Sequence, residues 1–166
     1  IQLIKEANKA DKTIGVVAQK NEGIENPTKN DIHSIGTVAR ILRVLKMPDG
    51  NTMVVIQGKK RFEIGDFVQT EPYIKASAKE MVEEYPDVKD TEFLAIIESI
   101  RDLSLKIIKE NPNLPTEATF AIKNIQSNSF LVNFVSSNMN LDVSEKQELL
   151  NINNLKDRAL ATLKKM

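Results

Sequence analysis

The chain has 166 residues, and its 23 Lys and Arg balance 23 Asp and Glu, so the formal net charge is zero. Hydrophobic residues make up 41% and charged residues 28%, as in ordinary globular proteins. The charge balance offers no basic excess for binding a phosphate backbone, and the lack of Cys excludes disulfides and thiolate metal sites. With a single His, a metal site built from several histidines is also excluded.

The first half of the chain alternates short apolar runs with turn residues. Residues 1–10 are predicted to form a short amphipathic helix, because apolar side chains recur on one face. Residues 14–18 form a compact β-branched run typical of a strand, and residues 21–31 hold Gly, Pro and several Asn, which predict a loop. The chain starts without Met and already inside a helical pattern, so we expect it to be a fragment of a longer protein.

A β-hairpin is predicted around the turn signal Pro48-Asp49-Gly50. Residues 35–47 would also suit a helix face, but the apolar run 53–56 follows the turn at once, and this arrangement favours a hairpin. Gly58 is expected to close the second strand, and a further strand is expected through Phe62 and Ile64, with residues 67–68 as a candidate extension.

The last strand and the helices follow from clear periodicities. Residues 74–82 alternate apolar and polar side chains, which predicts a strand with one face in water. After Pro86 the pattern becomes helical and almost free of Gly. Residues 90–110 predict one long amphipathic helix, which Asn111-Pro112 ends.

Four shorter helices are predicted after the long one. Pro115 with Glu117 is typical of a helix start. The next helix should span residues 127–138 and bury Phe130, Leu131, Phe134 and Val135. The run 144–147 (SEKQ) is typical of a capping box that opens another helix, and Asn153 or Asn154 should cap the last one. Short polar links between these helices predict a compact bundle.

Catalytic and metal-binding motifs are not evident in the sequence. The run 58–60 (GKK) lacks the upstream glycine and the Ser or Thr of a phosphate-binding loop. A Ser-His-Asp triad would have to use His33, which sits in a polar stretch beside a loop. The acidic residues between Glu80 and Asp90 match no calcium-binding loop and are expected to form a solvated face, as are the basic residues 59–61 on an edge strand. The residues alone therefore indicate a binding module.

Several stretches, in this order, carry a family resemblance. They are residues 16–20 (VVAQK), 36–42 (GTVARIL), 45–50 (LKMPDG), 54–58 (VVIQG) with Arg61 and Ile64, Leu114-Pro115 with Glu117, 145–150 (EKQELL) and Arg158. Together they resemble the N-terminal domains of Lon ATP-dependent proteases over nearly the whole chain. Two departures stand out. The chain starts inside the first helix, so the first strand of the family is expected to be missing, and Asn133 stands where many relatives carry an acidic residue.

The resemblance implies an α+β fold. A β-rich, PUA-like pseudobarrel lobe is expected at residues 1–86, and an α-helical bundle at residues 87–166 that leads towards an absent AAA+ module. The implied function is non-catalytic: a substrate-recognition domain of a Lon-type ATP-dependent serine protease that captures unfolded or damaged proteins in protein quality control. No catalytic, cofactor-binding or metal-binding residue is expected in this chain.

The implied parent is a homohexamer with two further modules downstream. One is an AAA+ ATPase that uses ATP and Mg, and the other is a peptidase with a Ser-Lys dyad. The bacterial cytoplasm is the expected location, with the mitochondrial matrix as the alternative. The expected partners are unfolded or damaged protein substrates and the parent's own modules, with no membrane partner, and nucleic acid is disfavoured.

Recognition of unfolded proteins requires apolar surface that the core does not use. We therefore expect substrate contacts at the hairpin tip, at Leu45, Met47, Pro48 and Met53, because Met is flexible and suits loose specificity. The alternative interpretation is that these side chains pack the end of the barrel. Two other functions stay open: a stand-alone protein-binding module of this type, and a PUA-like RNA-binding module, which the neutral charge disfavours.

Overall fold

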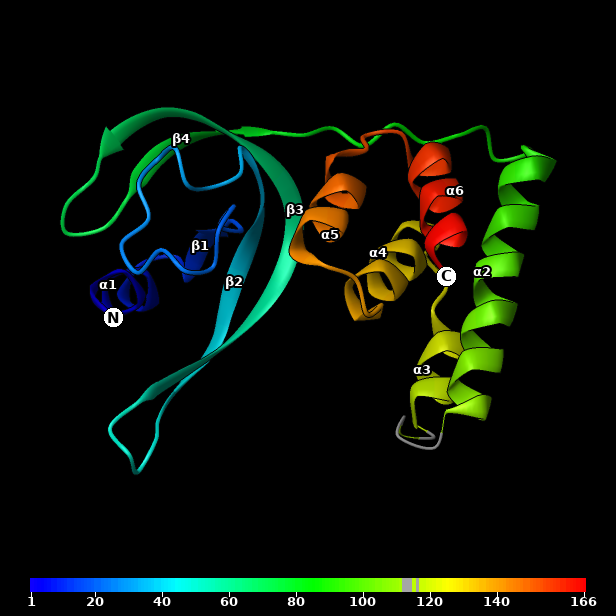
Figure 1. Ribbon diagram of the computed structural model, residues 1–166, viewed down its shortest axis with the longest axis horizontal. Helices are drawn as coiled ribbons and strands as arrows, with labels where there is room; N and C mark the ends of the chain where they lie inside the picture. Colours follow the sequence, from blue (N-terminus) through cyan, green and yellow to red (C-terminus); the bar gives the residue numbers. More distant parts are fainter. Residues whose placement is uncertain (112–114, 116) are drawn as a thin grey trace. The chain divides into compact units, whose positions relative to one another are not determined.

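The chain folds into two compact units, Ile1–Met81 and Val82–Met166, in a computed structural model that describes residues 1–111, 115 and 117–166 (Figure 1). The first unit is a β-sheet with one helix and the second is helical, which confirms the predicted α+β class with a β-rich lobe before a helical bundle. The sequence pattern changes at Pro86, whereas the boundary between the units lies between Met81 and Val82. Among the described helices, none is long and apolar enough to cross a membrane.

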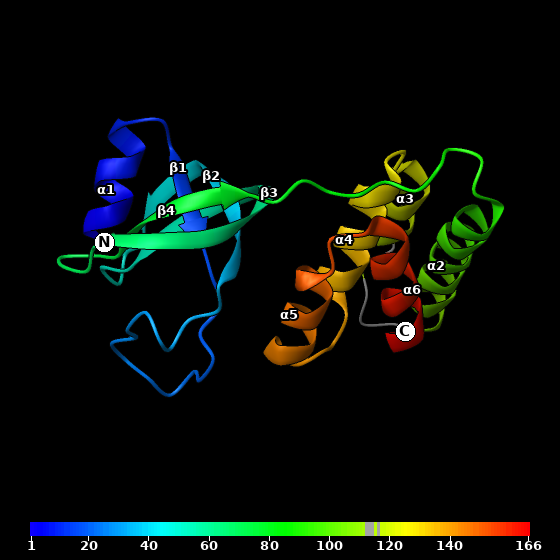
Figure 2. The same cartoon turned by 90° about the horizontal axis from the view of Figure 1, so that it is seen from above.

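The first unit is built on one antiparallel sheet with the strand order β1-β2-β3-β4. Its elements are α1 (Gln2–Lys9), β1 (Thr13–Val16), β2 (Ile35–Lys46), β3 (Thr52–Gln69) and β4 (Lys75–Glu80). The two central strands are long and curved, and β1 and β4 lie at the two edges (Figures 1 and 2).

The prediction that Gly58 closes a strand is wrong, because β3 runs through it without interruption. Gly58 pairs with Ala39 and Lys60 pairs with Val38, so Lys59 is an extra residue opposite the β2 strand. Such a β-bulge bends a strand and increases its twist without ending its pairing. The predicted second and third strands are therefore one strand of 18 residues.

The predicted hairpin is confirmed, and its turn depends on one glycine. The Gly50 N–H donates to the Met47 carbonyl at 3.0 Å, and the Met47 N–H donates to the Asn51 carbonyl at 2.8 Å. Gly50 has a φ of 85°, in the left-handed region that costs other L-residues free energy. A three-residue loop with a left-handed glycine in its last position is a common hairpin connection.

Phe62 anchors the base of the two central strands. It lies directly opposite Gly36, and the tip of its ring contacts the position that a Cβ on Gly15 would occupy. A Cβ on Gly36 would lie 2.4 Å from the Val16 carbonyl oxygen and 3.1 Å from the Phe62 ring. Ala39 and Ile41, further along β2, are also buried. The hairpin is thus held firmly at its base, while the residues beyond Ile41 are mostly exposed.

The described residues of the second unit form the five predicted helices. They are α2 (Thr91–Glu110), α3 (Glu117–Asn124), α4 (Asn128–Asn138), α5 (Val143–Asn151) and α6 (Leu155–Lys165). Asp90, Ser127 and Asn154 cap the starts of α2, α4 and α6 through side-chain oxygens that accept backbone N–H groups. The core includes Ile97, Ile100, Leu131, Leu155 and Ala159. Pro112, Leu114 and Thr116, on which part of the predicted α2–α3 connection depends, lie outside the described residues.

Two local predictions in this unit are wrong. Phe130 is 56% exposed rather than buried, because Leu131, Val132 and Val135 form the inward face of α4 and leave Phe130 beside it. The capping box of α5 also starts earlier than predicted. The Asp142 N–H donates to the Glu145 carboxylate at 3.2 Å, so the box consists of these two residues, and Gln147 is buried instead.

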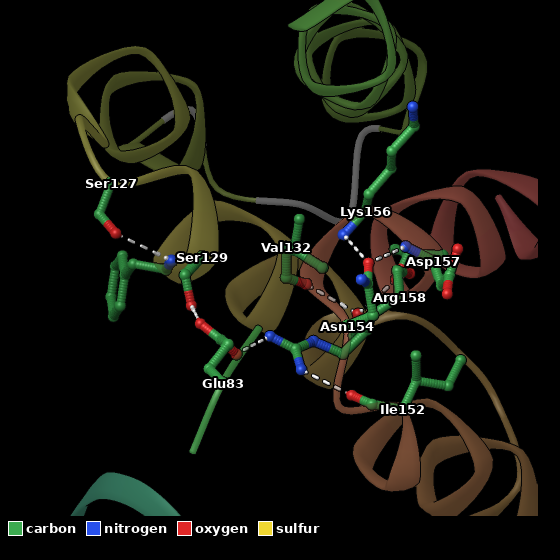
Figure 3. A network of polar contacts seen from close by, with 12 residues as sticks. Glu83, Ser127, Ser129, Val132, Ile152, Asn154, Lys156, Asp157 and Arg158 are labelled. Carbon is green, nitrogen blue, oxygen red and sulfur yellow. Dashed lines mark hydrogen bonds and ion pairs between the residues drawn. The ribbon is translucent and has the colours of Figure 1, made fainter. Parts of the chain in front are cut away.

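A polar network fixes the first residues of the second unit to the bundle (Figure 3). The buried Arg158 guanidinium forms an ion pair with Glu83 and donates to the Ile152 carbonyl at 2.8 Å. The Ser129 hydroxyl donates to the other Glu83 oxygen at 2.6 Å. Burial raises the pKa of Glu83, but the hydrogen bonds from Ser129 and Arg158 outweigh it and lower the pKa below the usual 4.5. The sequence pattern predicted that Glu83 would belong to a solvated acidic face. This prediction is wrong for Glu83, because its carboxylate is bound by Arg158 and Ser129 inside the helical unit.

Candidate functional site: an exposed apolar hairpin

The four predicted contact residues lie together at the end of the hairpin. Leu45 on β2 and Met53 on β3 are direct cross-strand partners, and Met47 and Pro48 lie in the turn that joins the strands. The side chains of Leu45 and Met53 are 44% and 49% exposed, and Met47 and Pro48 are also exposed. The structure thus places these residues on open surface rather than in the core of the sheet.

The pairing register assigns the exposed side chains to two faces of the hairpin. Directly opposed residues share a face, and side chains two positions apart along a strand point the same way. Leu45 with Met53 and Arg43 with Val55 therefore lie on one face, which we call the outer face. Ile41 pairs with Ile56 on the opposite face, where Ile41 is buried.

Sequence reasoning missed three further exposed apolar side chains, Leu42, Val55 and Ile56. Leu42 is 50% exposed because the register shifts between Ile41 and Arg43, which leaves Leu42 as an unpaired bulge residue. Their apolar side chains mark them as strand residues, but the sequence does not show that they are exposed. No signal in the sequence marks the bulge, because it is decided by pairing with β3.

The hairpin carries few charges that could bind a metal. Its one carboxylate, Asp49, accepts the Asn51 backbone N–H at 2.9 Å and the Asn51 side-chain amide at 2.8 Å, and these hydrogen bonds lower the pKa of Asp49. In the part of the chain that the structure describes, no group of three or more His, Cys, Asp or Glu side chains could hold a metal ion. The arrangement supports noncovalent contact with apolar side chains.

Fold and site together define an α+β binding module that presents apolar side chains on a projecting hairpin. The family model of the ATP-dependent protease La (LON) substrate-binding domain matches residues 1–166. The chain belongs to this family of Lon substrate-binding domains, as the motifs in the sequence indicate.

Curated relatives agree with this assignment. Lon protease of Flavobacterium johnsoniae is 66% identical over 166 residues, which cover 100% of this chain and 20% of that protein. Lon protease of Cytophaga hutchinsonii is 44% identical over the same length, again covering 100% of this chain and 20% of the relative. The chain therefore spans about a fifth of the length of the relatives it matches.

Solved structures share the fold at low sequence identity. The N-terminal domain of Lon protease from the Mycobacterium avium complex superposes with a TM-score of 0.69 at 18% identity, covering 92% of this chain and 88% of that chain. A Lon N-terminal domain protein from Xanthomonas campestris gives a TM-score of 0.61 at 12% identity, covering 98% of this chain and 81% of that chain.

Proposed function

We propose that this domain captures unfolded or damaged proteins through the apolar hairpin and delivers them to an ATP-dependent serine protease. The observation that carries the proposal is the cross-strand pair Leu45 and Met53, two apolar side chains that lie about half exposed on a structurally anchored hairpin. Burying apolar surface of this kind against a partner is favourable, and unfolded chains expose such surface whereas folded proteins bury it.

The wider role follows from family membership. Because the relatives are Lon proteases about five times longer than this chain, the motor and the peptidase are proposed to reside in parts of the parent outside it. These parts would use ATP and Mg, assemble as a homohexamer and cut peptide bonds with a Ser-Lys dyad, while this domain supplies no catalytic group. The organisms of the relatives are bacteria, which supports the cytoplasm as the site of this quality control.

The test is capture of a permanently unfolded polypeptide by the hairpin. Reduced, carboxymethylated lactalbumin serves as the probe, and its binding to the 166-residue chain is measured by biolayer interferometry. Met47→Ser combined with Met53→Ser should weaken binding about tenfold or more, since each substitution removes apolar area from the contact. Both side chains are exposed, so circular dichroism should show an unchanged fold.

A matched control separates the hairpin from exposed apolar surface in general. Ile1 and Val68 are 80% and 72% exposed and lie elsewhere in the first unit. The double substitution Ile1→Ser with Val68→Ser should leave binding of the unfolded probe nearly unchanged. Equal binding by the hairpin variant and the original chain would refute the assignment of the site.

A further inference from the structure

Two arginines lie on the same outer face as the exposed apolar residues. Arg43 is the cross-strand partner of Val55, and Arg40 is the partner of Gln57. Val55 and Gln57 are two positions apart on β3, so their side chains point to one face, and their partners Arg40 and Arg43 share it. The bulge at Leu42 makes this possible, because without it residues 40 and 43 would point in opposite directions.

The guanidinium groups of both arginines are available to bind an external partner. Both side chains are exposed, and among the described residues neither guanidinium forms an ion pair or a hydrogen bond. Between residues 40 and 57 the basic side chains are Arg40, Arg43 and Lys46, and the one acidic side chain, Asp49, is occupied by Asn51. The hairpin is thus locally basic in a chain whose formal net charge is zero.

We propose that the outer face of the hairpin selects unfolded segments in which acidic side chains lie close to apolar ones. This inference rests on the proposed function and adds the substrate class. An Arg guanidinium binds a carboxylate through two parallel hydrogen bonds, which favours Asp, Glu or a C-terminal carboxylate over neutral side chains. Leu45 and Met53 supply the apolar contact beside it.

The geometry also sets a spacing. The Arg43 and Val55 pair and the Leu45 and Met53 pair are two residues apart along the strands, which is roughly 7 Å. An extended polypeptide repeats its side-chain direction every two residues. An acidic residue two positions from a large apolar residue would therefore meet Arg43 and the Leu45 and Met53 pair at once.

An acidic polypeptide fits this face better than a nucleic acid does. A nucleic acid strand would need positive charge along its whole path and aromatic surfaces for base stacking. Here the arginines are followed by Leu45 and Met53 at the end of the hairpin, and the hairpin between residues 40 and 57 has no aromatic residue. A sugar-phosphate backbone offers no large apolar group that could contact the apolar end of the hairpin.

The experiment uses three fluorescein-labelled peptides of equal length and equal Leu content. The residue two positions from each Leu is Glu in the first peptide, Gln in the second and Lys in the third. The affinity of each peptide for the 166-residue chain is measured by fluorescence anisotropy. We expect the Glu peptide to bind about three- to tenfold more tightly than the Gln peptide, since exposed charge pairs contribute modestly, and the Lys peptide to bind most weakly. In about 0.5 M salt the preference should shrink, because the contacts are screened.

Matched variants test the assignment to the two arginines. Arg40→Gln with Arg43→Gln should abolish the preference for Glu over Gln and leave the affinity for the Gln peptide nearly unchanged. Lys5→Gln with Lys29→Gln removes the same charge from exposed positions elsewhere in the unit and should leave the preference intact. A labelled single-stranded RNA of equal length serves as the competing probe and should bind more weakly than the Glu peptide.

The outcomes separate this inference from the function on which it rests. Equal binding of the Glu and Gln peptides, with the loss on Met47→Ser and Met53→Ser retained, would overturn the acidic preference and leave capture of unfolded protein standing. Tighter binding of the RNA, unaffected by the Met substitutions, would overturn the preference in favour of a polyanion site. Failure of every peptide to bind would overturn both proposals.

Discussion

Arg158 and Glu83 form an ion pair inside the helical unit although 75 positions separate them in the sequence. The two side chains differ in burial, since 2% of the Arg158 side chain is exposed against 15% of the Glu83 side chain. Arg158 Nε is buried and has no hydrogen-bond partner among the described residues. The pair with Glu83 and the bond to the Ile152 carbonyl are therefore the main compensation for burying the guanidinium.

This asymmetry predicts which partner is more costly to remove. Glu83→Ala leaves a buried positive charge without its partner and should lower the free energy of unfolding by about 3 kcal/mol. Arg158→Met keeps most of the side-chain volume and leaves a carboxylate that water can reach, so it should cost about 1–2 kcal/mol. Urea unfolding followed by circular dichroism at the helix band measures both. As a control, Lys60→Ala breaks the exposed pair with Glu80 and should cost at most about 1 kcal/mol.

Stability should fall at acid pH because three carboxylates in this unit have lowered pKa values. Glu83 is described above, Asp90 is lowered chiefly by its hydrogen bond from Lys156, and Glu145 chiefly by its hydrogen bond from Lys165. A group whose pKa is lower in the folded state stabilises the fold above its ordinary pKa and loses this effect as the pH falls through the folded value. The free energy of unfolding should therefore be flat near pH 7 and decline below about pH 4.5.

The contribution of Glu83 to this decline can be isolated by Glu83→Gln. The variant should be less stable than the original chain at pH 7, and its free energy of unfolding should fall less steeply between about pH 4.5 and pH 3. Identical slopes for the two proteins would show that Glu83 does not titrate with folding.

Gly36 should not tolerate a side chain. A Cβ there would lie 2.4 Å from the Val16 carbonyl oxygen and 2.5 Å from the Val17 side chain, so Gly36→Ala should force the β1 and β2 strands apart. Overpacking of this kind costs about 1–3 kcal/mol. Gly23→Ala is the control, because its Cβ would meet only the end of the Asn21 side chain at 3.3 Å. Thermal unfolding of the two variants should differ by several degrees.

At Gly50, backbone conformation alone should limit which residues the position tolerates. A Cβ at this position meets nothing within 4 Å, yet its φ of 85° is unfavourable for residues other than glycine. Gly50→Ala should destabilise the turn by about 1 kcal/mol, and Gly50→Asn should cost less because Asn adopts this conformation more readily. Amide exchange of Met47, whose N–H bonds to Asn51, reports the opening of the turn. Equal exchange rates in the Ala and Asn variants would contradict this explanation.

The hairpin and the five later helices could be predicted because their signals are local. Pro48-Asp49-Gly50 specifies a turn through its own backbone preferences, and Asp90 and Asn154 cap helices through residues two or three positions away. The continuity of β3 through Gly58 could not be predicted, because the bulge at Lys59 depends on the register with β2.

Long-range contacts account for the remaining differences. Glu83 belongs to a run of acidic residues and carries no local sign that Arg158 will pair with it. Phe130 and Phe134 contact each other with ring centroids 6.1 Å apart, but which side of α4 faces the core is decided by the neighbouring helices. The composition of the outer face of the hairpin could likewise not be predicted, because Arg40 and Arg43 point the same way only as a result of the bulge at Leu42.

The backbone of Glu84 has a mechanical consequence for the helical unit. Its N–H donates to the Asn153 carbonyl at 3.3 Å, and its carbonyl accepts the Leu155 N–H at 2.9 Å, where α6 begins. Two backbone hydrogen bonds therefore join the first residues of the unit to the start of its last helix. A pulling force along α6 would act on these two hydrogen bonds and on the Arg158 ion pair before it reached the other helices. We therefore expect mechanical unfolding of the unit to begin with the breaking of these contacts.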